Sequence, residues 1–178
     1  MTLTLTGPFR GSAAVAAGLV TPAVLRGPRY QRIFPDVYAP AALEADLALR
    51  ARAAGVLVAG RGVVAGYAAA ELLGASSAPA DALVDVLMPH AYRCDGIAVR
   101  RTGLGPDELT SVGPTVVTTA ARTAFDLARW APTLTERVSA VSTPSPTTVP
   151  SIRRRCGCCA TGTSESVMAA GSPRSSRW

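Results

Sequence analysis

The sequence predicts an α+β protein whose chain falls into three parts. Residues 9–38 combine two short helical patterns with two short strand patterns, and both kinds of pattern alternate through residues 41–138. Leucine occurs sixteen times in the first 138 residues and not at all in the last forty, where serine and threonine together number fourteen. We therefore expect a helix-turn-helix unit over residues 1–40, a small mixed α/β domain over 41–138 and a disordered basic C-terminal tail over 139–178.

Two capped helices are predicted near the amino terminus. Ser12 is placed to cap a first short helix, AAVAA, which ends at Gly18 because glycine tolerates a left-handed backbone. Thr21 is placed to cap a second helix, with Pro22 at the first position, where an N–H is not needed. A glycine-proline pair directly after Arg26 ends this second helix.

Two short strands are predicted to follow the helices. Residues 29–34 alternate basic or polar side chains with apolar ones, and Pro35 and Asp36 make the turn into Val37 and Tyr38. Two short helices joined by a glycine-containing turn and followed by a hairpin describe a winged helix-turn-helix.

Arginine dominates the charge of this first unit. The chain has eighteen basic residues, all arginine, and residues 1–35 contain four of them and no acidic residue. Such a positive segment is the electrostatic requirement for contact with a phosphate backbone, so we predict binding to double-stranded DNA. The alternative, which the sequence leaves open, is that these arginines only form a solvated face.

The clearest helical pattern in the second part covers residues 40–55. Pro40 stands at its start and Gly55 directly follows its last turn, while acidic residues precede basic ones in the order that the helix dipole favours. Its buried stripe is predicted to consist of Leu43, Leu47, Ala51 and Ala54.

Further elements are predicted downstream. Strands are expected at residues 83–88, 96–101 and 115–118, and helices at 66–74 and 120–130, the last capped by Thr119. The predicted inner face of the last helix consists of Ala121, Ala124, Phe125 and Ala128, and its predicted outer face of Arg122, Asp126 and Arg129.

The sequence predicts no catalytic, cofactor or metal site. Three glycines within residues 57–66 fall one residue off the dinucleotide-binding fingerprint and lack its acidic residue. His90, the only histidine, has no nucleophile or orienting carboxylate at a catalytic spacing and is expected in an exposed loop. Cys156, Cys158 and Cys159 lack the paired spacing of zinc ligands. We therefore expect a protein that is not an enzyme.

Three stretches in a fixed order carry a family resemblance. They read FRGSAAVAAGLVTPAVLRGPRYQRIFPDVYAP, AGYAAAELLGA and TVVTTAARTAFDLAR, and they span roughly residues 9–131. In this order they resemble actinobacterial proteins related to the AbiEi antitoxins, which begin with a winged helix and continue with an α/β antitoxin domain. The resemblance implies a DNA-binding transcriptional regulator of a toxin-antitoxin operon, with a cognate toxin as a further partner.

The resemblance also assigns residues. It implies DNA contacts from Arg26, Arg29, Tyr30 and Arg32. With Arg10 and Thr21 of the same segment, these residues form the candidate DNA-binding set. This sequence departs from the family at Asp36, where relatives have glycine before a Val-Tyr pair, so we expect a differently shaped hairpin turn.

A second function follows from what the chain lacks. Many relatives carry a further domain that resembles the very-short-patch-repair endonucleases, and such a nuclease needs spaced carboxylates to hold Mg²⁺. After Glu136 the only acidic residue is Glu165. The alternative function is therefore a truncated, inactive relative of such an endonuclease, which retains only its accessory N-terminal region.

Location and tail complete the expectations. No apolar run reaches the roughly 18 to 20 residues of a membrane span, and the N-terminus has no basic leader, so we expect a cytoplasmic protein. The tail is either a natural basic arm or a frameshifted remnant of a lost domain, because a GC-rich gene read in the wrong frame yields such a composition. Translating the other frames of the gene would separate the two.

Overall fold

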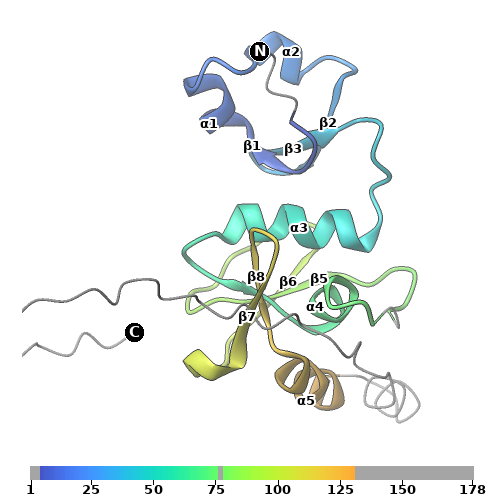
Figure 1. The fold of residues 1–178 in the computed structure, drawn as a ribbon, viewed down its shortest axis with the longest axis vertical. Helices are drawn as coiled ribbons and strands as arrows, with labels where there is room; N and C mark the ends of the chain where they lie inside the picture. Colours follow the sequence, from blue (N-terminus) through green and yellow to red (C-terminus); the bar gives the residue numbers. More distant parts are fainter. Residues whose placement is uncertain (1–4, 76–77, 131–178) are drawn as a thin grey trace, which may run out of the picture. The chain divides into compact units, whose positions relative to one another are not determined.

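The computed structural model describes residues 5–75 and 78–130 and confirms the α+β class, with two sheets and helices around them (Figure 1). The predicted tail and its three cysteines lie outside the described residues. Within the described ranges, every helix is too short or too polar to cross a lipid bilayer.

The first unit contains the two predicted helices and the predicted hairpin, plus one short strand that the sequence did not predict. Its antiparallel sheet has the strand order β1-β3-β2, with both helices inserted between β1 and β2. The elements are β1 (Phe9–Arg10), α1 (Gly11–Ala16), α2 (Pro22–Leu25), β2 (Tyr30–Phe34) and β3 (Val37–Pro40).

The caps of the two helices differ in how they form. Thr21 caps α2 as predicted, since its Oγ1 accepts a hydrogen bond from the Val24 amide at 3.3 Å, and Gly18 has the expected positive φ of 69°. The predicted Ser12 cap is wrong, because α1 already begins at Gly11. Both the amide and the hydroxyl of Ser12 instead donate to the carboxylate of Asp36, and hydrogen bonds to a charged acceptor are stronger than those between neutral groups.

Helix α3 (Leu47–Val58) begins later and ends later than predicted. Asp46 caps it, its Oδ1 accepting from the Leu49 amide at 2.7 Å, whereas Pro40 belongs to β3 and Leu43 precedes the helix. Gly55 does not end the helix. A Cβ at this position would lie 2.5 Å from Cγ2 of Thr115, so the glycine permits close packing of α3 on the second sheet.

The second sheet has the strand order β6-β5-β4-β8-β7, with parallel pairing of β5 with β6 and of β4 with β8. The predicted strands and the predicted helix at 66–74 are confirmed, while the strand β7 was not predicted. The elements are β4 (Val63–Val64), α4 (Gly66–Leu72), β5 (Val84–Leu87), β6 (Ile97–Arg100), the 3₁₀ turn η1 (Pro106–Glu108), β7 (Leu109–Val112), β8 (Thr115–Thr118) and α5 (Ala120–Trp130).

One buried cluster joins the two sheets. Phe34 and Val37 of the hairpin lie in the same cluster as Ala51 and Ala54 of α3 and Val86 of β5. Helix α3 contacts every strand of the first sheet and also β4, β5 and β8, so it lies between the two sheets (Figure 1). Its alanines let both sheets approach closely, and the core therefore continues across residue 40.

Candidate nucleic-acid interface

The exposed arginines of the predicted DNA-binding set lie along the hairpin and the end of α2. Arg26 follows α2 and its Nε donates to the Pro22 carbonyl at 3.2 Å, which directs the side chain back along its own helix. Arg29 is exposed just before β2, and Arg32 is exposed in the middle of that strand. Arg29 and Arg32 are three residues apart, a length of about 10 Å in extended chain.

Arg10 differs from the other three arginines because the fold already uses it. Its Nη2 donates to the Leu57 carbonyl at 2.8 Å, which ties β1 to the last turn of α3. Its Nη1 also lies 4.0 Å from Oδ2 of Asp36. The geometry gives Arg10 a structural role.

Asp36 brings a negative charge into this positive segment. It adopts the left-handed backbone with φ of 59°, the region that glycine favours, although the sequence led us to expect a differently shaped turn. Its side-chain hydrogen bond with Ser12 holds the pKa of its carboxyl below the usual value, and the charges of Arg10 and Arg32 act in the same direction. The turn end of the hairpin is therefore partly neutralised, and the most strongly positive part lies at Arg26 and Arg29.

Tyr30 and Thr21 also have structural roles in this unit. Phe9 packs edge-on against the ring of Tyr30, with 5.2 Å between ring centroids, and stacks on Tyr38 at 6.3 Å. These rings hold β1 and β2 on β3. Tyr30 and Arg32 are two residues apart on β2 and so share one face of the strand.

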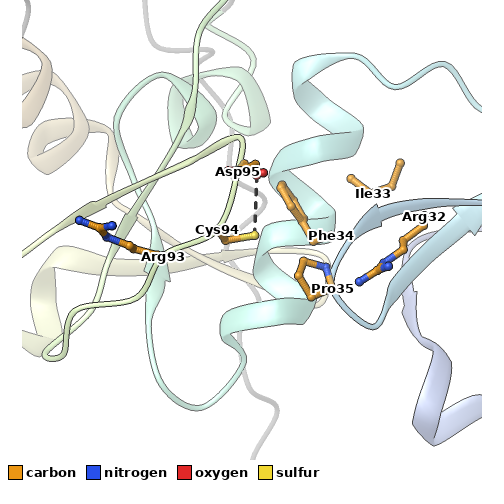
Figure 2. Close-up of a pocket in the computed structure, with 7 residues that line it drawn as sticks. All are labelled: Arg32, Ile33, Phe34, Pro35, Arg93, Cys94 and Asp95. Atoms are coloured by element: carbon orange, nitrogen blue, oxygen red, sulfur yellow. Dashed lines mark hydrogen bonds between the residues drawn. The ribbon is translucent and has the colours of Figure 1, made fainter.

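The structure adds one basic residue that the sequence gave no means of finding. An open pocket of about 390 Å³ is lined by the hairpin turn and by the loop before β6, and Arg32 and Arg93 both contribute to it (Figure 2). Cys94 lies between them with its thiol 3.7 Å from the Asp95 carbonyl, and burial raises the pKa of this thiol. A raised thiol pKa disfavours the thiolate, which is the nucleophilic form of cysteine.

A second polar cluster lies around α5, and it overturns the predicted orientation of that helix. Arg122 and Asp126 are buried, with exposures of 8% and 1%, whereas Phe125, predicted to face inward, is 59% exposed. Of the three residues of the predicted outer face, only Arg129 is exposed. Thr119 does cap the helix as predicted, with its Oγ1 accepting from the Arg122 amide at 3.4 Å.

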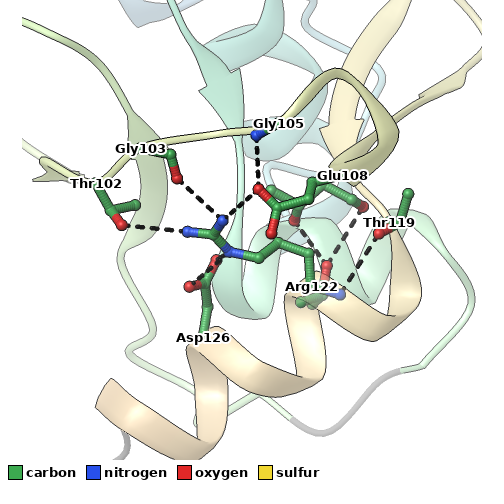
Figure 3. Close-up of polar contacts among 9 residues, drawn as sticks. Thr102, Gly103, Gly105, Glu108, Thr119, Arg122 and Asp126 are labelled. Carbon is green, nitrogen blue, oxygen red and sulfur yellow. Dashed lines mark hydrogen bonds and ion pairs between the residues drawn. The ribbon is translucent and has the colours of Figure 1, made fainter.

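The guanidinium of Arg122 explains this reversal (Figure 3). Its Nε lies 3.0 Å from both oxygens of Asp126, and its Nη1 donates to Glu108 at 2.8 Å and to the Gly103 carbonyl at 3.1 Å. Its Nη2 donates to Thr102 at 3.3 Å. Glu108 in turn accepts from the Gly105 amide. Because nearly every donor is used inside the protein, this cluster fastens the loop before β7 to α5 and leaves little capacity for a ligand.

The carboxyl groups around Arg122 have shifted pKa values. Burial raises the pKa of Asp126, against the opposing effect of its bonds to Arg122. The pKa of Glu108 is lowered, mainly by its hydrogen bond from the Gly105 amide and next by Arg122.

No group of three or more His, Cys, Asp or Glu residues within residues 5–75 and 78–130 is arranged to hold a metal ion. His90 lies exposed in the loop after β5, as predicted.

No protein-family model matches the chain, and no curated protein matches it at a significant level.

Proposed function

We propose that the protein is a DNA-binding transcriptional regulator of the AbiEi antitoxin type, which contacts duplex DNA through its first unit. The observation that carries the proposal is that Arg26, Arg29 and Arg32 are all exposed on one helix-helix-hairpin unit. The order of elements and the strand order β1-β3-β2 support a winged helix, in which such a unit meets the DNA backbone.

The three arginines determine the kind of binding. In this proposal the guanidinium groups contact phosphates, so affinity should depend strongly on salt and weakly on sequence. Helix α2 has only four residues and offers few side chains to a major groove. In this proposal Thr21 positions α2, and Tyr30 positions β2 and offers its hydroxyl to a phosphate.

A salt series of duplex binding tests the proposal. The logarithm of the association constant should fall with the logarithm of salt concentration with a slope of about −3, close to one unit per arginine. The triple variant Arg26→Ala, Arg29→Ala, Arg32→Ala should lose measurable binding. The matched control removes three exposed arginines elsewhere, Arg52, Arg101 and Arg129, and should bind nearly as the parent does. Equal losses in the two triple variants would refute the assignment, since they would show only a net-charge effect.

A second candidate function has its own supporting observation. The outer face of α5 carries exposed Phe125 beside alanines, as does a helix face that another domain covers. The chain would then be the accessory region of a protein related to very-short-patch-repair endonucleases. A folded chain that binds no duplex at low salt favours this second function over the first.

The antitoxin part of the proposal concerns a protein partner. The α/β domain would bind a cognate toxin, and the gene next to this one is the place to seek it. Co-expression of the two products followed by affinity purification should recover both in a fixed ratio. Recovery of this protein alone would remove the antitoxin role and leave the DNA-binding role to its own test.

A further inference from the structure

A pocket that contains none of Arg26, Arg29 and Arg32 lies on the α/β domain, where β5 and β6 meet α4 and α5. Its volume is about 250 Å³, below the range of about 300–1,000 Å³ that suits drug-sized ligands, so it fits one ring system. The side chains that carry the argument are Tyr67, Asp81, Asp85, Arg100, Leu127 and Trp130.

Arg100 is held in this pocket on two sides. Its Nε donates to Oδ1 of Asp85 at 3.0 Å, and its guanidinium carbon lies 5.0 Å from the centroid of the Trp130 ring. The side chain is nevertheless 44% exposed, and within the described part of the chain its two Nη groups have no hydrogen-bond partner. A planar donor pair is thus fixed in direction and open to a ligand.

The acidic residues of the pocket supply acceptors of two kinds. Asp85 is only 7% exposed, and burial raises its pKa, with Arg100 opposing and Asp126 reinforcing the shift. Its role is to orient Arg100. Asp81 is exposed at the rim, and its carboxylate makes no hydrogen bond with any described residue, so it can accept donors from a ligand.

These features together match a flat heterocycle with both acceptors and donors on its edge. Aromatic rings and guanidinium planes stack on nucleobases, which supports a ring between the pocket walls. Among the bases, guanine has O6 and N7 as a paired acceptor for arginine and an amino group as donor for a carboxylate. A purely apolar ligand would leave the Arg100 donors unsatisfied.

We propose that this pocket binds a single guanine base, with Arg100 reading O6 and N7, Asp81 accepting from the amino group, and Trp130 and Tyr67 forming the walls. The proposal is independent of duplex binding by Arg26, Arg29 and Arg32, because none of these residues lines the pocket. A free nucleotide and an unpaired guanine in a single strand present the same chemistry to the pocket.

Calorimetric titration of the full-length chain tests the proposal. The probes are GMP, AMP, CMP and UMP, and single-stranded oligonucleotides of equal length with and without guanine. GMP should bind more tightly than the other three mononucleotides if free nucleotide is the source. Binding only by the guanine-containing oligonucleotide would identify a strand as the source. Absence of binding by GMP and by both oligonucleotides at millimolar concentration would overturn the proposal.

Two variants and two matched controls assign the contacts. Arg100→Met should weaken guanine binding by about tenfold or more, whereas Arg101→Met, at its exposed neighbour, should not. Since Arg100→Met leaves Asp85 buried without its partner, circular dichroism must show a folded chain. Asp81→Asn at the exposed rim avoids that difficulty and should weaken GMP relative to AMP, with Glu44→Gln as its control. Equal binding by each variant and its control would overturn the assignment, as would a requirement for Arg26, Arg29 and Arg32.

Discussion

At the scale of single residues, charges that the fold has paired differ from charges that it has left exposed. Arg10 and Arg122 use their donors on protein acceptors, whereas Arg26, Arg29 and Arg32 remain exposed. A sequence gives every arginine the same weight. Only the acceptors around each guanidinium decide which one can reach a ligand.

Asp36 should weaken the proposed contact with DNA. Asn at this position keeps a carbonyl acceptor for Ser12 and tolerates the positive φ, but removes the negative charge beside Arg32. Asp36→Asn should therefore strengthen duplex binding by up to about fivefold at low salt, the effect of one unit charge at short range in water. Binding in a gel-shift titration measures this, and weaker binding by the variant would contradict it.

Asp36 also predicts a pH dependence of stability. Its folded pKa is lowered, so its contribution to stability is complete above the unfolded pKa of about 3.9 and is lost as the pH falls through the folded value. Asp36→Ala should thus be less stable than the parent at pH 7, and the difference should shrink towards pH 3. Urea unfolding at several pH values measures the difference. A gap that stays constant down to pH 3 would exclude the hydrogen-bonded carboxylate as its source.

Arg122 should be the costliest single charge to remove. Arg122→Leu leaves Asp126 buried at 1% exposure without its partner, and breaking a buried pair in this way costs about 3–5 kcal/mol of unfolding free energy. Arg129→Leu, on the exposed side of the same helix, should change it by less than about 0.5 kcal/mol. Similar losses in both variants would mean that α5 depends on charge in general rather than on this cluster.

At the scale of elements, close packing decides where helices end and which way they face. The sequence places Gly55 as a helix terminator, yet α3 continues through this residue. The missing Cβ of Gly55 instead leaves the room in which Thr115 packs against the helix. The apolar stripe of α5 predicts a buried Phe125, yet the polar side of the helix is buried because Glu108, Asp126 and Gly103 converge on Arg122. Amphipathic patterns assume that polar groups face water, and they fail where polar groups find partners inside.

Gly55→Ala should reverse the usual effect of alanine in a helix. Helix propensity alone would stabilise the variant by about 1 kcal/mol, but the clash with Thr115 adds an overpacking cost of about 1–3 kcal/mol. Thermal unfolding should therefore show a lower Tm. In a Thr115→Ala background the same change should be neutral or stabilising. A loss of equal size in both backgrounds would show that Thr115 is not the obstacle.

At the scale of the whole molecule, the described residues share one core. Phe34 of the hairpin is 4% exposed and lies in the same buried cluster as the alanines of α3 and the valines of the second sheet. The first unit therefore shares its core with the second sheet and is not connected to it by a linker alone. A change in packing at the hairpin should therefore affect the domain that carries the pocket around Arg100.

Phe34→Ala should test this shared core. The change should lower the free energy of unfolding by about 3–5 kcal/mol, as is usual for a buried phenylalanine. Hydrogen exchange should then speed up together in β2, β3 and β5 rather than in the hairpin alone. Exchange that changes only within residues 30–40 would contradict a single cooperative unit.

The sequence by itself determined the α+β class, the Gly18 and Thr21 signals of the first two helices, the hairpin, and the strands at 84–87, 97–100 and 115–118, because turn residues and apolar runs act locally. Tertiary structure alone decided the capture of Ser12 by Asp36, the course of α3 past Gly55 and the burial of Arg122. Each of these depends on a partner far along the chain. The pocket around Arg100 arises in the same way, since its walls come from two strands and two helices whose packing no local pattern encodes.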